Sequence, residues 1–357
     1  MTTVTENLRI ASIRAVSTPA QVQVELPLSE AAAQTTVSAR REIQQILQGH
    51  DDRLLVIVGP CSIHDPQAAL DYAAKLRPLR DQLGKQLQIV MRVYFEKPRT
   101  TVGWKGLIND PGLDDSYDIN RGLRLARKLL LDLNERGLPA GVEFLDILTP
   151  QYIADLVSWG AIGARTTESQ LHREMASGLS SPVGFKNGTD GSVKVAVDAV
   201  QSARNPHRFL TQTRTGETAI FETRGNADTH IILRGGSTGT NYDAKSVEAA
   251  CAALSKAGIQ PQVMIDFSHA NSQKQHKRQL LVSQDVGHQI AGGDKRIIGV
   301  MVESHLVEGR QEIGPREQMV YGQSVTDACI HWDDTVELLR GLAGSVAQRQ
   351  ARLAKTA

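Results

Sequence analysis

Six basic residues in this chain have the types and the spacing of an anion-binding site, because each lies at or just after the end of a short apolar segment. They are Arg92, Lys97, Arg99, Arg165, Lys186 and Arg234. Arginine binds phosphate and carboxylate through paired hydrogen bonds, and lysine adds a compact point charge. Six cations exceed what one phosphate can use. We therefore expect two phosphates, or a phosphate and a carboxylate, to bind together as parts of small metabolites.

The stretch 87–106, LQIVMRVYFEKPRTTVGWKG, holds three of these cations. Its apolar first half predicts a strand, and Pro98 ends that strand because proline fixes φ. Arg92 lies among apolar neighbours, where an unpaired charge is costly. Lys97 and Arg99 alone have a simpler interpretation as solvated loop charges, but Arg92 inside the strand favours a bound anion.

A second group of residues combines sulfur, nitrogen and oxygen donors. Cys61, His269 and Glu303 each follow a different apolar segment, and Asp327 lies in the string SVTDACI. This mixture suits one divalent ion such as Mn, Fe, Co or Zn better than Mg or Ca. Taken singly, Cys61 has the ordinary interpretation of a small buried residue, and His269 that of a phosphate donor. Glu303 and Asp327, taken singly, are ordinary ion-pair partners for the arginines. Only the convergence of all four side chains at one place favours a metal site.

Eight apolar segments of strand length must position these residues. They span 54–58, 88–93, 141–145, 161–164, 182–185, 230–233, 262–265 and 297–302. Segments with the hydrophobic periodicity of an α-helix separate nearly all of them, for example 118–136, 168–177, 192–204 and 244–256. This alternation predicts a parallel sheet buried on both faces. Eight units without a strand–GxGxxG–helix motif favour an α/β fold of the (β/α)8 TIM-barrel type over an open doubly wound sheet.

In such a barrel, the active site is built at the C-terminal ends of the strands. All the candidate residues above except Asp327 lie at or just beyond a predicted strand end, and Glu143 lies inside the third segment. Helix capping does not explain this pattern, because arginine, lysine and cysteine are poor caps. We therefore expect one active site at one end of the barrel.

Two additions to the barrel are predicted. Residues 1–50 form an N-terminal arm, in which a helix begins after Ser29 as N-cap and stops at Gly49. Residues 51–357 form the barrel, with an inserted β-hairpin at 209–221, where TRTGET separates two short apolar runs.

Composition limits the other classes of function. The formal net charge of +1 gives no reason to expect nucleic acid or a membrane surface as a partner. Three scattered cysteines (Cys61, Cys251 and Cys329) do not form a disulfide framework, and no apolar run approaches the ~18 residues of a membrane span. No basic segment followed by an apolar stretch opens the chain, so a soluble, cytoplasmic protein is expected.

Long, uncommon strings along almost the whole chain resemble the type I, feedback-regulated 3-deoxy-D-arabino-heptulosonate 7-phosphate (DAHP) synthases. They are GPCSIHD (59–65), RVYFEKPRTTVGWKG (92–106), WGAIGARTTESQ (159–170), SPVGFKNGTDG (181–191), ILRGG (232–236), IDFSHAN (265–271) and SVTDACI (324–330). The resemblance implies the same barrel fold. It also implies the condensation of phosphoenolpyruvate with erythrose 4-phosphate, with release of phosphate, as the first step of the shikimate pathway.

The resemblance also assigns residues. Those matching the phosphoenolpyruvate site are Arg92, Lys97, Glu143, Arg165, Lys186 and Arg234. Arg99 and Thr100 match the erythrose 4-phosphate site, and Cys61, His269, Glu303 and Asp327 match all four metal ligands. For the catalytic step we expect the metal to act as a Lewis acid, Glu143 to orient the water and Lys97 to donate a proton.

A regulatory pocket is implied outside the barrel mouth. Positions matching it are Pro150, Gln151, Leu179, Ser180, Phe209 and Thr211. An aromatic amino acid bound there would inhibit by ordering the arm across a homodimer or homotetramer interface. The alternative is that these residues only pack the flank of the barrel.

Three other functions are alternatives for this sequence. A 3-deoxy-octulosonate 8-phosphate synthase takes a five-carbon sugar phosphate, but its relatives resemble KANRSS where this chain has KPRTT, and they usually lack such an arm. A phosphate-binding or nucleotide-sugar-binding barrel of unrelated chemistry does not account for the metal-ligand set. A non-catalytic effector-binding barrel has no need for four intact ligands.

Overall fold

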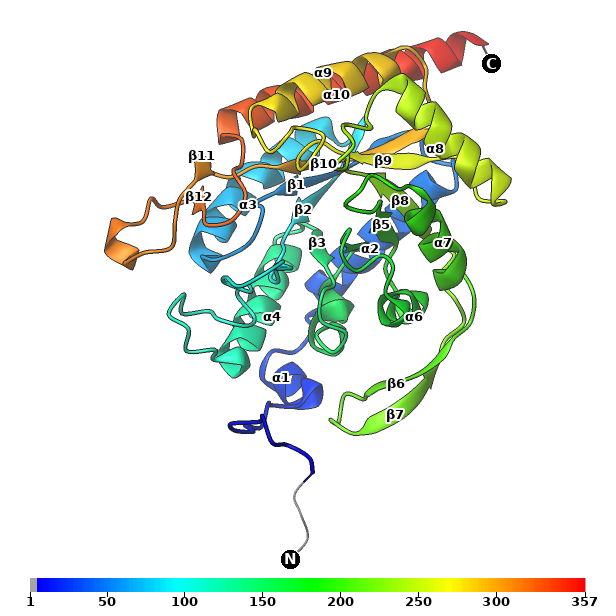
Figure 1. Ribbon diagram of the computed structural model, residues 1–357. Coiled ribbons are helices and arrows are strands. Elements are labelled where there is room, and N and C mark those ends of the chain that lie inside the picture. The colour runs from blue at the N-terminus through cyan, green and yellow to red at the C-terminus, as the bar shows by residue number, and fades with distance from the viewer. Residues whose placement is uncertain (1–4, 357) are drawn as a thin grey trace, which may run out of the picture.

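The computed structural model describes residues 5–356, and at its centre eight parallel strands form a closed barrel (Figure 1). Around the barrel they are β1 (Leu54–Gly59), β10 (Ile297–Glu303), β9 (Val263–Asp266), β8 (Thr229–Leu233), β5 (Val183–Lys186), β4 (Trp159–Ile162), β3 (Ala140–Glu143) and β2 (Leu87–Arg92). The ring closes because β1 pairs in parallel with both β10 and β2. The eight predicted segments coincide with these strands to within one or two residues at each end. The predicted TIM barrel is confirmed.

Both faces of the strands are buried, which explains their continuous apolar sequence. In β1, Leu55 and Ile57 face a core inside the barrel that also contains Trp159. The alternating residues Val56 and Val58 belong to a second core between the strands and the surrounding helices. The period of two therefore divides each strand between two packed layers.

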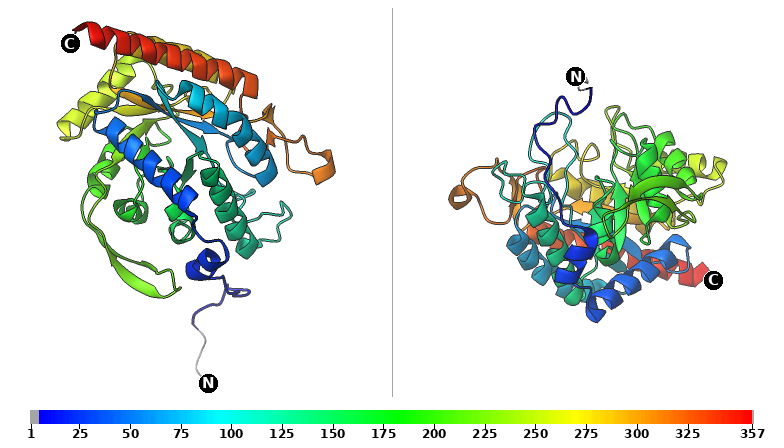
Figure 2. Two further views of the ribbon diagram at one scale, coloured as in Figure 1. Left: turned by 180° about the vertical axis from the view of Figure 1, so that it is seen from behind. Right: turned by 90° about the horizontal axis from the view of Figure 1, so that it is seen from below.

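Helices surround the barrel on its outside (Figure 2). They are α3 (Pro66–Leu83), α4 (Ile119–Glu135), α6 (Gln170–Gly178), α7 (Lys194–Ala203), α8 (Ala244–Lys256), α9 (Arg278–Ala291) and α10 (Trp332–Thr356). After β3 there is only the short α5 (Pro150–Ile153), continued by a 3₁₀ turn, η1 (Ala154–Leu156). The four helices that the sequence predicted between strands are confirmed as α4, α6, α7 and α8.

The N-terminal segment contains α1 (Pro19–Glu25) and α2 (Glu30–Leu47). The Ser29 hydroxyl accepts a hydrogen bond from the Ala32 N–H at 3.3 Å, so the predicted N-cap is confirmed. At the other end of α2, Ile43 and Ile46 pack into the core inside the barrel. The helix thus covers the end of the barrel opposite the mouth. Residues 15–28 lie against the outside of the barrel, and the described residues before them extend away from it (Figures 1 and 2).

The predicted hairpin is confirmed as antiparallel β6 (Arg208–Gln212) and β7 (Thr218–Glu222), which project from the barrel between α7 and β8 (Figure 1). A second small sheet, β11 (Val307–Arg310) with β12 (Gln323–Ser324), was not predicted, nor was the 3₁₀ turn η2 (Arg316–Gln318) in the loop joining its strands. Within the described residues, no helix combines the length and the apolar character that a membrane crossing requires.

Candidate active site at the barrel mouth

A cavity of about 160 Å³ opens at the C-terminal ends of the barrel strands. The predicted residues that line it are Lys97, Arg99, Glu143, Arg165, Lys186, Arg234, His269 and Asp327. They follow β2, β3, β4, β5, β8, β9 and β10, so the parallel strands bring them to one face, as the sequence predicts. The cavity is therefore strongly cationic and suited to small anions.

Arg92 does not line this cavity. Its side chain is fully buried, and it donates from Nη2 to a Glu303 carboxylate oxygen at 2.9 Å and to the Cys61 carbonyl at 3.2 Å. The guanidinium carbon lies 3.5 Å from the centre of the Tyr94 ring. The buried charge inferred from the sequence is thus paired with a carboxylate, next to the sulfur and oxygen donors.

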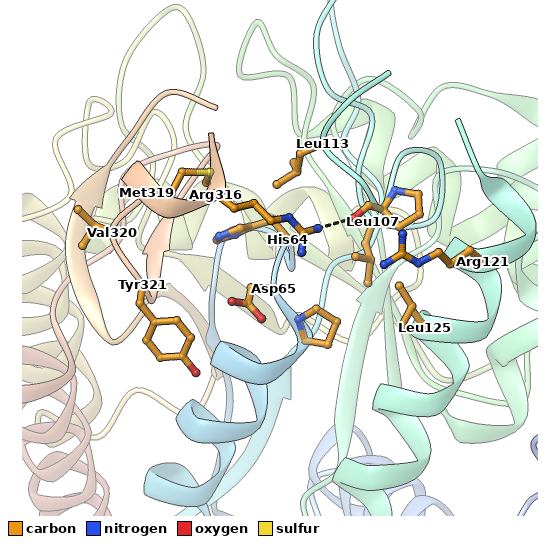
Figure 3. Close-up of a pocket in the computed structure, with 12 residues that line it drawn as sticks. His64, Asp65, Leu107, Leu113, Arg121, Leu125, Arg316, Met319, Val320 and Tyr321 are labelled. Atoms are coloured by element: carbon orange, nitrogen blue, oxygen red, sulfur yellow. Dashed lines mark hydrogen bonds between the residues drawn. The ribbon is translucent and has the colours of Figure 1, made fainter. Parts of the chain in front are cut away.

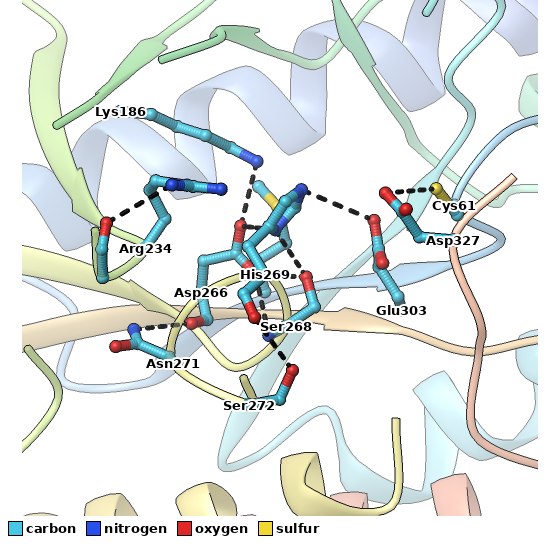
Figure 4. Close-up of polar contacts among 12 residues, drawn as sticks. Cys61, Lys186, Arg234, Asp266, Ser268, His269, Asn271, Ser272, Glu303 and Asp327 are labelled. Carbon is cyan, nitrogen blue, oxygen red and sulfur yellow. Dashed lines mark hydrogen bonds and ion pairs between the residues drawn. The ribbon is translucent and has the colours of Figure 1, made fainter. Parts of the chain in front are cut away.

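Three of the four predicted metal ligands, Cys61, Glu303 and Asp327, cluster beside the cavity, and the fourth, His269, lies next to Glu303 (Figure 4). Ligand atoms of Cys61, Glu303 and Asp327 all lie within 4.8 Å of one another, and Cys61 Sγ is 3.6 Å from Asp327 Oδ2. His269 Nε2 lies 3.9 Å from Glu303 Oε1. One thiol, one imidazole and two carboxylates in this arrangement fit a borderline divalent ion.

Closure of the barrel produces this cluster. Gly59, two residues before Cys61, pairs with Glu303 across β1 and β10. β9, which ends three residues before His269, is the next neighbour of β10. No local segment could hold these donors together.

Lys97 connects the donor cluster to the cavity. Its Nζ lies 3.1 Å from Cys61 Sγ, and its side chain also lines the cavity. Burial alone would lower the pKa of Lys97, but the neighbouring Cys61, Glu303 and Asp327 raise it above its ordinary value. Lys97 is therefore a charged ammonium group at neutral pH.

Asp266, at the end of β9, is a residue of the site that the sequence analysis did not select. Its Oδ2 accepts from Lys186 Nζ at 2.9 Å and lies 2.9 Å from His269 Nδ1. Burial alone would raise its pKa, but Lys186 and His269 hold the pKa of Asp266 well below its usual range. This carboxylate orients the imidazole so that Nε2 faces Glu303. The only sequence signal was an acidic residue at a strand end, three positions before a candidate ligand.

His269 itself has φ of 58°, a left-handed conformation that is uncommon for residues other than glycine. Such backbone strain is typical of functional positions that the surrounding structure over-determines. Here the Ser268 hydroxyl lies 2.7 Å from His269 Nδ1 and donates to the second oxygen of Asp266 at 2.7 Å. The strained turn and these bonds fix the direction of the imidazole.

Glu143, the last residue of β3, is buried and lines the cavity. It depends on Gly163, because a Cβ at that position would lie 2.2 Å from Glu143 Oε1. A carboxylate among cations is well placed to hold a water molecule. Glycine at 163 therefore leaves the space that the Glu143 side chain occupies.

The loop after β2 carries the residues that match the sugar-phosphate site. Arg99 lines the cavity and donates from Nε to the Trp104 carbonyl at 2.7 Å. The neighbouring Thr100 is exposed and is not part of the cavity wall. The structure therefore brings Arg99, but not Thr100, to the cations of the mouth.

Comparisons with known proteins give the family. A family model described as "DAHP synthetase I family" matches residues 25–340. This chain belongs to the DAHP synthetase I family. The resemblance seen in the sequence is confirmed.

This family member is similar in sequence to named relatives over nearly its full length. It is 62% identical over 345 residues to a "Phospho-2-dehydro-3-deoxyheptonate aldolase, Phe-sensitive" of Escherichia coli, covering 97% of this chain and 98% of the relative. It is 54% identical to a Trp-sensitive counterpart from the same species, covering 97% and 99%. A solved phospho-2-dehydro-3-deoxyheptonate aldolase from Francisella tularensis has a TM-score of 0.94 at 53% identity, covering 95% of this chain and 99% of that one.

The six positions matching a regulatory pocket lie on three segments of this DAHP synthetase I family protein. They are α5 (Pro150, Gln151), the residues just after α6 (Leu179, Ser180) and the hairpin (Phe209, Thr211).

Helix α1 contacts two of these segments. The Gln23 amide donates to the Gln151 carbonyl at 3.2 Å, and the Ala20 N–H donates to the Arg214 carbonyl of the hairpin turn at 2.8 Å. The N-terminal arm thus bridges the flank of the barrel and the hairpin.

Proposed function

We propose that this protein is a metal-dependent 3-deoxy-7-phosphoheptulonate synthase, a transferase that condenses phosphoenolpyruvate with erythrose 4-phosphate and water to give DAHP and phosphate. The observation that carries the proposal is that one cavity is lined by six arginine or lysine side chains, five of them from four separate strand ends, and adjoins the donor cluster. The name of the relatives, phospho-2-dehydro-3-deoxyheptonate aldolase, describes the same chemistry.

In the proposed complex, two anionic substrates lie side by side. We assign phosphoenolpyruvate, with its carboxylate and its phosphate, to Arg92, Lys97, Glu143, Arg165, Lys186 and Arg234. Five of these residues line the cavity, whereas Arg92 lies beneath its wall, paired with Glu303. We assign the phosphate of the four-carbon sugar to Arg99, in the cavity wall, and to Thr100, the next residue of the same loop, which lies outside that wall. Two such anions repel each other in water, so the fixed cations both offset the repulsion and align the reacting carbons.

Cys61, His269, Glu303 and Asp327 hold one divalent ion, which the donor set narrows to Mn, Fe, Co or Zn. When bound, the ion supplies Lewis-acid polarisation of the aldehyde carbonyl. The contacts that support this role are the hydrogen bond from Arg92 to Glu303 and the Asp266 contact to His269, because both fix the direction of a ligand.

The protein side chains then handle water and protons. C3 of phosphoenolpyruvate attacks the aldehyde carbon of the sugar, and Lys97 donates a proton to the aldehyde oxygen. A water held by Glu143 adds at C2, where positive charge develops. Glu143 accepts one proton of this water. The phosphate leaves with its bridging oxygen by C–O cleavage and takes the remaining proton of the C2 hydroxyl, which gives the ketone of DAHP.

Feedback inhibition by an aromatic amino acid is part of the proposal, since the relatives are named Phe-sensitive and Trp-sensitive. The effector binds at Pro150, Gln151, Leu179, Ser180, Phe209 and Thr211. The bridging contacts of α1 support this location, because an effector there would order the arm. We further propose a homodimer or homotetramer in which the arm and the hairpin form contacts between subunits.

The test follows the loss of phosphoenolpyruvate absorbance with erythrose 4-phosphate and, separately, with arabinose 5-phosphate. Turnover with only the four-carbon sugar supports the proposed function. Turnover with the five-carbon sugar would instead indicate an octulosonate synthase. No turnover from folded, metal-loaded protein would favour a non-catalytic effector-binding barrel.

A further inference from the structure

A second cavity, of about 250 Å³, lies beside the barrel mouth and has no lining residue in common with the mouth cavity. It lies between the start of α3, the start of α4 and the loop that contains η2 (Figure 3). Each of these segments contributes one nitrogen-rich side chain: His64, Arg121 and Arg316. Figure 3 shows the two arginines extending toward the same space from α4 and from the η2 loop.

The donors of this cavity are largely unused. His64 is only 8% exposed, and its Nδ1, which is itself buried, has no hydrogen-bond partner among the described residues. Arg316 donates from Nη2 to the Pro111 carbonyl at 3.2 Å, which leaves its other N–H groups available. The Arg121 guanidinium makes no hydrogen bond or ion pair within residues 5–356; only its backbone N–H does, to Asp118.

The one carboxylate of the wall, that of Asp65, is partly engaged. Asp65 is the N-cap of α3, and its Oδ1 accepts from the N–H groups of Gln67 at 2.8 Å and Ala68 at 3.3 Å. The Tyr321 hydroxyl donates to Asp71 at 2.5 Å, outside the cavity lining. Because the wall contains two arginines, Arg121 and Arg316, and one aspartate, Asp65, the polar side of the cavity has a net positive charge and many hydrogen-bond donors. An occupant must therefore bring acceptors and negative charge.

The rest of the wall is mainly apolar and includes Leu107, Leu125 and Met319. Transfer of apolar groups from water to such a wall is favourable. The volume of about 250 Å³ is below the roughly 300–1,000 Å³ of pockets for drug-sized ligands, so the occupant is small. Shape and lining together select a small molecule with one charged end and one apolar end.

We propose that this cavity binds a small organic acid, with a carboxylate or phosphate head held by Arg121, Arg316 and His64 and an apolar body about the size of a phenyl ring. The site differs from the proposed effector positions, because none of those six residues lines it. It touches both loops that form the mouth: His64 follows Cys61 by three residues, and Leu107 follows the loop that carries Lys97 and Arg99.

The experiment measures binding directly and does not depend on turnover. Full-length, metal-loaded protein with saturating phosphoenolpyruvate is titrated with 4-fluorophenylacetate, 4-fluorophenyl phosphate and the neutral 4-fluorobenzyl alcohol, followed by fluorine NMR. We expect at least one of the two acids to bind, with an affinity at least tenfold higher than that of the alcohol. The response of each acid distinguishes a carboxylate site from a phosphate site.

The double variant Arg121→Gln/Arg316→Gln decides where the acids bind. Both arginines are exposed, so the variant is expected to fold, and a thermal unfolding curve checks this. The dissociation constant of the bound acid should rise at least tenfold in the double variant and stay unchanged in Arg340→Gln, an exposed arginine on α10. Undiminished binding to the double variant, or no binding of either acid to the unmodified protein, would overturn the proposal.

Discussion

Asp266 is a buried carboxylate beneath the barrel mouth that contacts several charged or polar side chains of the site. One carboxylate oxygen contacts both Lys186 and His269, and the other accepts two hydrogen bonds from Ser268. Removing its charge would leave the buried Lys186 ammonium without its ion-pair partner and would release the imidazole of His269. Asp266 therefore acts on the proposed reaction through its neighbours.

Asp266→Asn keeps the shape of this side chain and removes its charge. We expect a 10- to 100-fold loss in metal affinity and in kcat/KM, the usual cost of removing a group that orients a metal ligand. Metal titration and steady-state kinetics measure the two effects. Asp198→Asn on the surface of α7 is the control, and equal behaviour of the two variants would contradict the role of Asp266.

His230 in β8 gives a prediction for acid stability. It is buried beside Trp159, whose Nε1 donates to His230 Nε2 at 3.3 Å. Burial, with a smaller contribution from Arg204, lowers the pKa of His230 to about 3. Between this value and the ordinary pKa of about 6.5, the unfolded chain binds a proton that the folded chain does not. The free energy of unfolding therefore falls as the pH drops below about 6.5.

For His230→Gln, the loss of unfolding free energy between pH 7 and pH 5 should be smaller than in the unmodified protein by about 2 kcal/mol. Urea unfolding at the two pH values measures this difference. His50→Gln, at an exposed position, should keep the full pH dependence. The same pH dependence in His230→Gln as in the unmodified protein would show that this histidine is not held neutral.

At the scale of elements, the hairpin β6–β7 has one face that nothing in the described chain covers. Leu210 and Ile220 are directly opposite each other across the two strands and are 67% and 72% exposed. An exposed apolar cross-strand pair is typical of an interface. This supports the proposed contact between subunits through the hairpin.

Leu210→Glu/Ile220→Glu places two like charges on that face. We expect the mass measured by analytical ultracentrifugation to fall to that of a smaller assembly. Val102→Glu makes the same kind of change at an exposed site in the loop after β2 and should leave the mass unchanged. An unaltered mass in the hairpin variant would exclude this face as the interface.

The sequence predicts most elements for a definite reason. A strand buried on both faces must be a continuous apolar run. The start of the helix at Glu30 is predictable because Ser29 is a favourable N-cap residue. The short elements are different: α5 with η1 and β11 with β12 have two to four residues each, too few for a periodic pattern. The strand ends differ by one or two residues because local sequence does not fix where pairing stops.

At the scale of the whole molecule, the site is a consequence of barrel closure. Cys61 and Asp327 are 266 positions apart, yet Sγ and Oδ2 are separated by 3.6 Å. The sequence predicts that such residues share one face, because strand ends in a barrel do. It could not predict that Arg92 lies beneath the cavity or that Thr100 lies outside its wall, since side-chain packing decides both.

In the proposed mechanism, the cluster of Cys61, His269, Glu303 and Asp327 holds a metal ion that condensation requires. The most direct measurement is metal content together with loss of phosphoenolpyruvate in the presence of erythrose 4-phosphate, before and after chelation and after re-addition of Mn or Co. The unmodified protein and Cys251→Ala, a buried cysteine on α8, should bind one ion per chain and regain turnover. Cys61→Ala should stay folded but lose the ion and nearly all activity, whereas full activity in metal-free Cys61→Ala would contradict the claim.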